Sequence, residues 1–141
     1  MDVRTYYTKK FRSLHIDRSK GTPAPHKAIL LISVIQAIAA HEIHNNRIFI
    51  TPELVARFKD NWHRFVHDLR FSSNFILPFY HLKSEGFWAL QTNAGKEILL
   101  TKSFSIRSFS QLKEAVAYAS FSEDLYALLQ DADSRTLLID T

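Results

Sequence analysis

Histidines are the first residues of this chain whose spacing could support chemistry. His63 and His67 stand four residues apart, a separation that places two zinc ligands on one face of a helix. The residues between them are Arg64, Phe65 and Val66, so the glutamate of the metalloprotease pattern is missing and a cation lies beside the pair. We interpret the two histidines as part of a solvated basic face, and we expect neither a metal ion nor a cofactor.

Carboxylates could also support catalysis, because a group of them can hold the divalent metal ion of a nuclease. The first half of the chain contains six, which are widely spread: Asp2, Asp17, Glu42, Glu53, Asp60 and Asp68. With only three glycines, the sequence also has no glycine-rich loop to cradle a phosphate. We therefore expect a non-catalytic recognition domain. A metal-dependent nuclease that uses the histidines is the rival, which metal analysis and a cleavage assay would test.

Positive charge is concentrated in the first half of the chain, although the net charge is only +4. Residues 1–70 hold twelve Lys and Arg against six Asp and Glu, whereas residues 71–141 hold six against eight. Six of the seven histidines also lie in the first half. Such a surface can bind a polyanion through phosphate contacts, or it can simply keep a small domain soluble.

The most unusual stretch is NFILPFYHLKSEGFW, residues 74–88, which contains five aromatic rings and a proline. Pro78 argues against a buried strand, and so many rings argue against a solvated loop. We predict a turn that Phe75, Phe87 and Trp88 anchor in the core. Pro78 then turns outward and forms a small apolar niche with its neighbours. The alternative is a loop that only closes the core.

The elements that position these residues are predicted to be mainly helices. Apolar residues at helical spacing and capping residues predict helices over Val3–Leu14, His26–His41, Pro52–Leu69, Ser108 to about Ala119, Ser122 to about Gln130, and a short one from Asp133. A short strand is expected at Ile48–Ile50, and a hairpin or two short strands around Asn93-Ala94-Gly95. The fold class is therefore mainly α, a single helical domain over residues 1–141 with a few short β-strands.

The helix Pro52–Leu69 is the clearest of these, because it combines a core stripe with a basic face. Its predicted core stripe consists of Leu54, Val55, Phe58, Trp62, Phe65, Val66 and Leu69. Arg57, Lys59, Arg64 and Arg70 populate its other faces. The helix is thus a candidate for entering a groove of DNA.

The cysteine content and the hydropathy of the sequence indicate the cellular compartment in which the protein is expected. The chain has no cysteine, which suits a reducing interior, so we expect a cytoplasmic protein. The longest apolar run, residues 28–40, is broken by Ser33 and Gln36 and is too short to span a bilayer, so no membrane partner is expected.

Two motifs give the sequence a family resemblance. They are APHKAILLISVIQAI, in which a basic pair enters an apolar helix, and LPFYHLKSEGFWAL, in which a proline-aromatic segment precedes a tryptophan-containing strand. With NRIFITPEL between them, the chain resembles the sulfur-binding domain at the N-terminus of type IV, McrA-like restriction endonucleases that act on phosphorothioated DNA. An HNH nuclease domain commonly follows in such proteins. Because the sequence ends in what looks like a helix cut mid-course, we expect it to be the N-terminal part of a longer nuclease.

The resemblance implies a mainly helical module with a surface cavity for the sulfur that replaces a non-bridging phosphate oxygen. Carried onto this chain, the cavity would be formed by Leu77, Pro78, Phe79, Tyr80 and His81. Contacts to phosphate or bases would come from Pro25, His26, Lys27, Arg64, Arg70, Lys102, Ser103 and Arg107. The expected partner is phosphorothioated double-stranded DNA, to which the domain would target a nuclease.

Two further functions stay open at this point. In the first, the chain is a general DNA-binding domain whose basic helix enters a groove without recognising sulfur. In the second, it is a protein-interaction domain with no affinity for nucleic acid. Binding of matched modified and unmodified duplexes separates all three.

Overall fold

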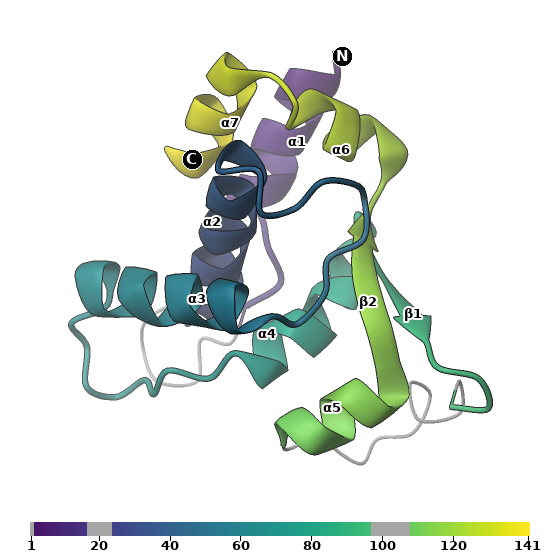
Figure 1. Ribbon diagram of the computed structural model, residues 1–141. Helices are drawn as coiled ribbons and strands as arrows, with labels where there is room; N and C mark the ends of the chain where they lie inside the picture. Colours follow the sequence, from purple (N-terminus) through teal and green to yellow (C-terminus); the bar gives the residue numbers. More distant parts are fainter. Residues whose placement is uncertain (1, 17–23, 97–107) are drawn as a thin grey trace.

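The structure is a computed structural model that describes residues 2–16, 24–96 and 108–141. In chain order, the described elements are α1 (Val3–Arg12), α2 (His26–Ala39), α3 (Pro52–Phe65), α4 (Ile76–His81), the 3₁₀ helix η1 (Leu82–Glu85), β1 (Trp88–Thr92), α5 (Phe109–Ala115), β2 (Val116–Phe121), α6 (Glu123–Leu128) and α7 (Ala132–Ile139) (Figure 1). The prediction of one mainly helical domain with a minor strand component is confirmed.

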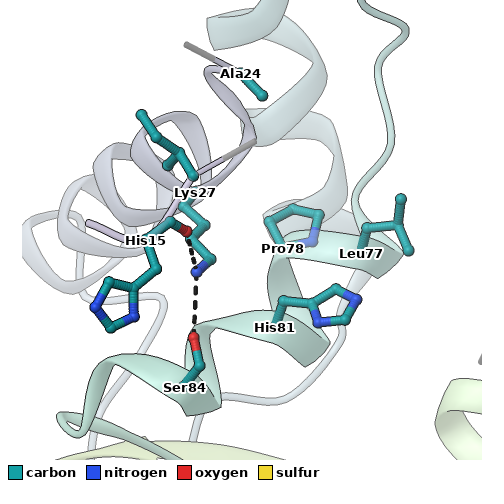
Figure 2. A pocket seen from close by; sticks show the side chains of 8 residues that line it. His15, Ala24, Lys27, Leu77, Pro78, His81 and Ser84 are labelled. Carbon is teal, nitrogen blue, oxygen red and sulfur yellow. Dashed lines mark hydrogen bonds between the residues drawn. The ribbon is translucent and has the colours of Figure 1, made fainter. Parts of the chain in front are cut away.

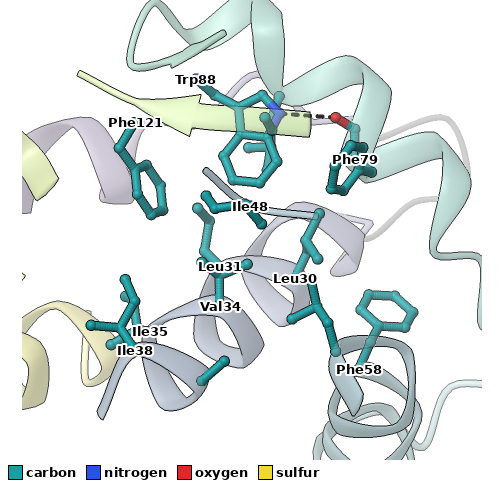
Figure 3. Packing of buried hydrophobic residues seen from close by; sticks show 14 of the residues in the cluster. Leu30, Leu31, Val34, Ile35, Ile38, Ile48, Phe58, Phe79, Trp88 and Phe121 are labelled. Carbon is teal, nitrogen blue, oxygen red and sulfur yellow. Dashed lines mark hydrogen bonds between the residues drawn. The ribbon is translucent and has the colours of Figure 1, made fainter. Parts of the chain in front are cut away.

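Helix α2 lies at the centre of the domain and packs against α3, α4 and α7. Its sequence is apolar on nearly every face, which suits a helix that other elements surround. Leu30 and Val34 are fully buried, and Figure 3 shows Leu30 between Phe58 of α3 and Phe79 of α4. The core is therefore continuous from α3 across α2 to the sheet.

The sheet consists of β1 and β2, which pair antiparallel with Trp88 opposite Phe121. The two rings meet edge to face, with their centroids 5.4 Å apart. Asn46 extends the sheet, because its side chain accepts a hydrogen bond from the Phe121 N–H at 2.8 Å and donates one to the Phe121 carbonyl at 2.7 Å. Of the strand predicted at Ile48–Ile50, only a bridge between Ile48 and Ala119 is formed.

Several predicted helix starts are confirmed by their caps. The Thr51 hydroxyl accepts a hydrogen bond from the Leu54 N–H at 3.1 Å, with Pro52 as the first helical residue of α3. The Ser108 hydroxyl does the same for the Gln111 N–H of α5. The last helix begins slightly earlier than predicted, because Asp131 and not Asp133 is its cap.

The end of α3 corrects the sequence prediction. The helix ends at Phe65 rather than Leu69, and Phe65 and Leu69 are 52% and 99% exposed instead of lying in the core. Val66 is extended, and the Asp68 carboxylate then accepts a hydrogen bond from the Arg70 N–H at 3.0 Å. Such a local side-chain turn competes with helix, so the apolar stripe stops short of its predicted length.

The segment predicted to continue α5 as far as Ala119 is the strand β2 instead. Its residues Val116, Tyr118 and Phe121 belong to types that strands favour, and pairing with β1 supplies the hydrogen bonds that a longer helix would have made. β1 was predicted from the turn signal at Asn93-Ala94-Gly95, but the strand on the far side of that turn falls outside the described residues. Its observed partner lies further along the chain.

The C-terminus of α2 ends two residues before the predicted His41. His41 adopts the left-handed conformation, with a φ of 60°. Its N–H donates to the Ile38 carbonyl at 3.1 Å, and the Glu42 N–H donates to the Ala37 carbonyl at 2.9 Å. This pair of hydrogen bonds is a Schellman motif, which usually has glycine at the position that His41 occupies. No helix in the described ranges combines the length and hydrophobicity that crossing a lipid bilayer requires.

Candidate functional site

The proline-aromatic stretch predicted to be a turn is helical, which corrects that prediction. Pro78 is the third residue of α4, in the first turn, where a helix does not need the missing N–H. The Asn74 side chain accepts a hydrogen bond from the Leu77 N–H at 3.2 Å and so supports the start of the helix. A proline near the start and an asparagine just ahead of it therefore favour this short helix.

The chain leaves this helical segment at Gly86, whose φ of 89° is readily adopted only by glycine. The turn there directs Phe87 and Trp88 into the core, where Phe75 also lies, and all three are at most 4% exposed. The prediction that these three rings anchor the segment is thus confirmed. Pro78, by contrast, is buried rather than turned outward.

The ring of Pro78 nevertheless lines a surface cavity of about 260 Å³ between α4 and the start of α2. Figure 2 shows Leu77, Pro78 and His81 on one side and Ala24 and Lys27 on the other. The described residues that line it are His15, Ile16, Ala24, Lys27, Leu77, Pro78, His81 and Ser84. Most of this wall is apolar, and its two sides come from distant parts of the sequence.

The cavity brings together four of the predicted site residues: Lys27, Leu77, Pro78 and His81. The other two residues predicted to form it do not line it. Phe79 is fully buried and packs edge to face against Trp88, with centroids 5.4 Å apart. Tyr80 contacts the ring of His81 and carries the Lys83 ammonium 5.0 Å above its own ring.

Lys27 is predicted to meet phosphate, and the structure places it in the cavity wall as half of a buried ion pair. Its ammonium lies 2.5 Å from the Glu85 carboxylate, and these side chains are 10% and 2% exposed. The same ammonium donates to the His15 carbonyl at 2.6 Å and lies 3.4 Å from the Ser84 hydroxyl. Glu85 also accepts a hydrogen bond from the His15 N–H at 2.9 Å. The pair thereby ties the segment that follows α1 to η1.

Both histidines at the cavity are exposed on the surface of the domain. The His15 side chain is 73% exposed, and its Nδ1 lies 3.8 Å from Glu85. Partial burial of its ring, followed by the nearby charges of Lys27 and Lys83, lowers the pKa of His81 below its ordinary value. His81 is therefore a neutral ring at physiological pH, which suits a mostly apolar wall.

His26 and Pro25 lie beside the cavity, at the start of α2. The His26 Nε2 is 2.8 Å from the Ser72 carbonyl, and its ring packs against Trp62 with centroids 4.7 Å apart. Pro25 precedes the first helical residue, as predicted. His26 is thus held against α3 and the segment that follows it.

The remaining predicted contact residues are separate from the cavity. Arg64 is exposed on α3 and lines a polar hollow with Gln36, Arg57, Asp60 and Asn61. The guanidinium of Arg70 pairs with Asp68 at 2.7 Å, and this hydrogen-bonded partner raises its pKa. Lys102, Ser103 and Arg107 lie outside the described residues.

Comparison with known proteins identifies the family. A family profile described as "ScoMcrA-like, DNA sulfur-binding domain" matches residues 5–141. The chain belongs to this family of DNA sulfur-binding domains. The resemblance seen in the two sequence motifs is therefore confirmed over nearly the whole chain. A comparison with curated proteins gave no match.

A solved structure shows that this DNA sulfur-binding domain shares its fold with a relative. The structure is described as "Sulfur binding domain and SRA domain of ScoMcrA complexed with phosphorothioated DNA", and it superposes with a TM-score of 0.67 at 17% sequence identity. The match covers 95% of this chain and 40% of that chain. This DNA sulfur-binding domain is a recognition module in its family. Within the described ranges, no group of three His, Asp or Glu side chains could hold a metal ion.

Sequence reasoning missed four residues of the cavity wall, His15, Ile16, Ala24 and Ser84, and it missed the carboxylate of Glu85 behind that wall. One signal for Glu85 was present in the sequence. Lys27 is the only charged residue inside a helix that is apolar on nearly every face, and a buried lysine requires an anionic partner. The sequence does not say which acid provides it.

Proposed function

We propose that this domain binds phosphorothioate-modified double-stranded DNA and holds the non-bridging sulfur in the cavity between α4 and the start of α2. The observation that carries the proposal is the position of Pro78 and Leu77, whose apolar surfaces line this cavity beside the charged atoms of Lys27. Membership of the DNA sulfur-binding family supports the same ligand.

The chemistry of the wall favours sulfur over oxygen. Sulfur is larger and more polarizable than oxygen and accepts hydrogen bonds more weakly, so it loses less when it leaves water for an apolar niche. Contacts with the rings and methyl groups of Pro78, Leu77 and Ala24 add dispersion attraction. Discrimination of roughly ten- to two-hundredfold is within reach of a small pocket of this kind.

Affinity for the DNA backbone comes from exposed basic residues, most of which lie in the first half of the chain. Arg64 is exposed on α3 and is a candidate phosphate contact. Lys102 and Arg107 are two further candidates from the sequence. Such contacts strengthen binding to any duplex and weaken as salt rises, without reading the modification.

Paired duplexes test the proposal. One carries a single phosphorothioate and the other is identical except for oxygen at that position, and binding is measured by mobility shift. We expect the modified duplex to bind at least tenfold more tightly. Equal affinity would remove sulfur recognition and favour general DNA binding through α3. No binding to either duplex at low salt would favour a protein-interaction domain.

Pro78→Ala locates the sulfur. The substitution removes the ring but keeps the helix start, and it should lower the preference for the modified duplex by about tenfold. Pro52→Ala is the matched control, because Pro52 also lies in the first turn of a helix but away from the cavity. The control should keep the preference. A Pro78→Ala variant that keeps it as well would place the sulfur elsewhere.

We propose further that the domain serves to bring a nuclease to modified DNA, with an HNH domain in the same protein as the implied partner. The chain spans 40% of the solved relative, which leaves room there for other domains. A longer version of the protein that carries the nuclease should cleave the modified duplex and spare its oxygen counterpart. Cleavage of both at equal rates would separate recognition from nuclease targeting.

A further inference from the structure

Every hydrogen-bonding position of the Lys27 ammonium has a protein partner. The three acceptors are the Glu85 carboxylate at 2.5 Å, the His15 carbonyl at 2.6 Å and the Ser84 hydroxyl at 3.4 Å. A lysine ammonium has three N–H groups, so none is left over for a ligand. Lys27 thus brings a positive charge to the cavity wall without offering a hydrogen bond.

Among the described residues, the rest of the wall offers few side-chain donors. Ile16, Ala24 and Leu77 have apolar side chains, and Pro78 has no backbone N–H. The side-chain donors that remain among the described lining residues are the rings of His15 and His81 and the Ser84 hydroxyl. Figure 2 shows the Lys27 ammonium directed toward the His15 carbonyl and Ser84, away from Leu77.

A wall of this kind treats oxygen and sulfur differently. A phosphate oxygen that enters it gives up strong hydrogen bonds to water and finds no free N–H on Lys27 to replace them. Sulfur is a weak acceptor and has less to lose. The carboxylate of Glu85 also offsets part of the charge of Lys27, so the pair attracts an anionic oxygen less strongly than an unpaired lysine would.

We propose that Glu85 and Ser84 are specificity-determining residues, which exclude unmodified phosphate from the cavity by keeping the N–H groups of Lys27 occupied. The inference rests on the proposed sulfur site, and neither residue needs to touch the ligand. Their role is to position Lys27. A purely structural role for the ion pair predicts instead that its loss weakens binding of both duplexes in parallel.

The test compares Glu85→Gln and Ser84→Ala with the wild-type protein on the same two duplexes. Measurements are made at pH 8, well above the lowered pKa of His81. Glu85→Gln keeps an amide oxygen but removes the negative charge that holds the Lys27 ammonium, so the ammonium can turn toward a phosphate oxygen. The unmodified duplex should then bind about tenfold more tightly, and the sulfur preference should fall by a similar factor. Ser84→Ala releases the longest of the three contacts, and the preference should fall by about two- to threefold.

Two control variants separate the possible causes. Glu114→Gln makes the same change in a surface pair, where the carboxylate lies 3.0 Å from Lys96, and it should leave the preference unchanged. The double variant Lys27→Met with Glu85→Gln removes the donors together with their partner, so the preference should return toward the wild-type value. Ser84 is exposed, so Ser84→Ala gives a readout even if Glu85→Gln fails to fold.

The outcomes are distinct. A wild-type protein that binds both duplexes equally overturns the proposed function itself. A wild-type preference that Ser84→Ala and Glu85→Gln both leave intact, or variants that weaken both duplexes in parallel, would overturn the specificity role alone. A lower preference caused by tighter binding of the unmodified duplex supports it.

Discussion

The indole of Trp88, at the start of β1, donates its Nε1 proton to the backbone carbonyl of Phe79 in α4 at a distance of 2.9 Å. Both residues are at most 3% exposed, and their rings meet edge to face. The hydrogen bond therefore fixes the helix that carries Pro78 to the sheet. Phe79, which accepts this hydrogen bond, directly follows Pro78, the proline that lines the cavity.

Replacing Trp88 with phenylalanine should lower the free energy of unfolding by about 1–3 kcal/mol, because the buried Phe79 carbonyl loses its partner and the smaller ring leaves space. Urea denaturation measures the change. Trp62→Phe is the control, since the Trp62 indole N–H has no hydrogen-bond partner among the described residues. It should cost less than Trp88→Phe, and an equal cost would show that the hydrogen bond contributes nothing.

His41→Gly should stabilise the protein by about 1 kcal/mol, because glycine adopts the left-handed conformation of the α2 terminus without the steric cost that a side chain carries. Thermal unfolding of the two proteins measures the gain. His44→Gly is the matched control, as His44 is exposed a few residues away and is not a left-handed position. His44→Gly should lower the stability of the protein slightly, because glycine increases the conformational entropy of the unfolded chain. A loss of stability in His41→Gly would contradict the left-handed conformation of His41 at the end of α2.

Tyr7 should remain protonated to unusually high pH. Burial of the phenol, reinforced by its hydrogen bond to Asp124 at 2.6 Å, raises the pKa of Tyr7 to about 12. Because the folded pKa lies above the unfolded value of about 10, the protonated phenol contributes stability below pH 10, and that contribution is lost as pH rises through about 12. Tyr7→Phe should remove this part of the alkaline loss of stability. Denaturation at several pH values measures the effect. Tyr118→Phe, whose ring packs against Phe49 and not against Tyr7, should leave it in place.

Arg64→Ala should flatten the salt dependence of DNA binding. If Arg64 meets one phosphate, its loss should reduce the slope of log K against log salt by about 0.9 and weaken modified and unmodified duplexes alike. Arg135→Ala, in the acidic half of the chain, is the control and should keep the slope. A change in the sulfur preference with Arg64→Ala would mean that this residue reads the modification, contrary to our assignment.

The helices could be predicted because their signals are local. Thr51 with Pro52, and Ser108 with Gln111, mark starts that the structure confirms, since a cap acts on the N–H groups next to it. The strand β2 could not be predicted this way. Val116–Phe121 also fits a helix by its apolar spacing, and only pairing with β1 decides the outcome. Leu69 is a second example: its spacing fits the core stripe of α3, yet the helix ends before it and the residue is exposed.

The candidate site was predictable in part. The proline motif and the resemblance it carries pointed to Leu77, Pro78 and His81, which do line the cavity. Phe79 was assigned there as well, but consecutive residues of a helix point in different directions, and its ring lies in the core. The opposite wall, with His15, comes from a part of the chain that only the tertiary structure brings near.

The two walls of the cavity belong to segments that the buried pair of Lys27 and Glu85 holds together, 58 positions apart in sequence. An unfolded chain therefore has no such cavity, and a ligand that touches both walls binds the folded state alone. By mass action, its binding free energy adds to the stability of the domain, so that a saturating ligand at about a hundred times its Kd contributes about 2.7 kcal/mol. A rise in Tm with modified duplex, and a smaller one with its oxygen counterpart, would report occupancy of the cavity in a solution that contains only protein and DNA.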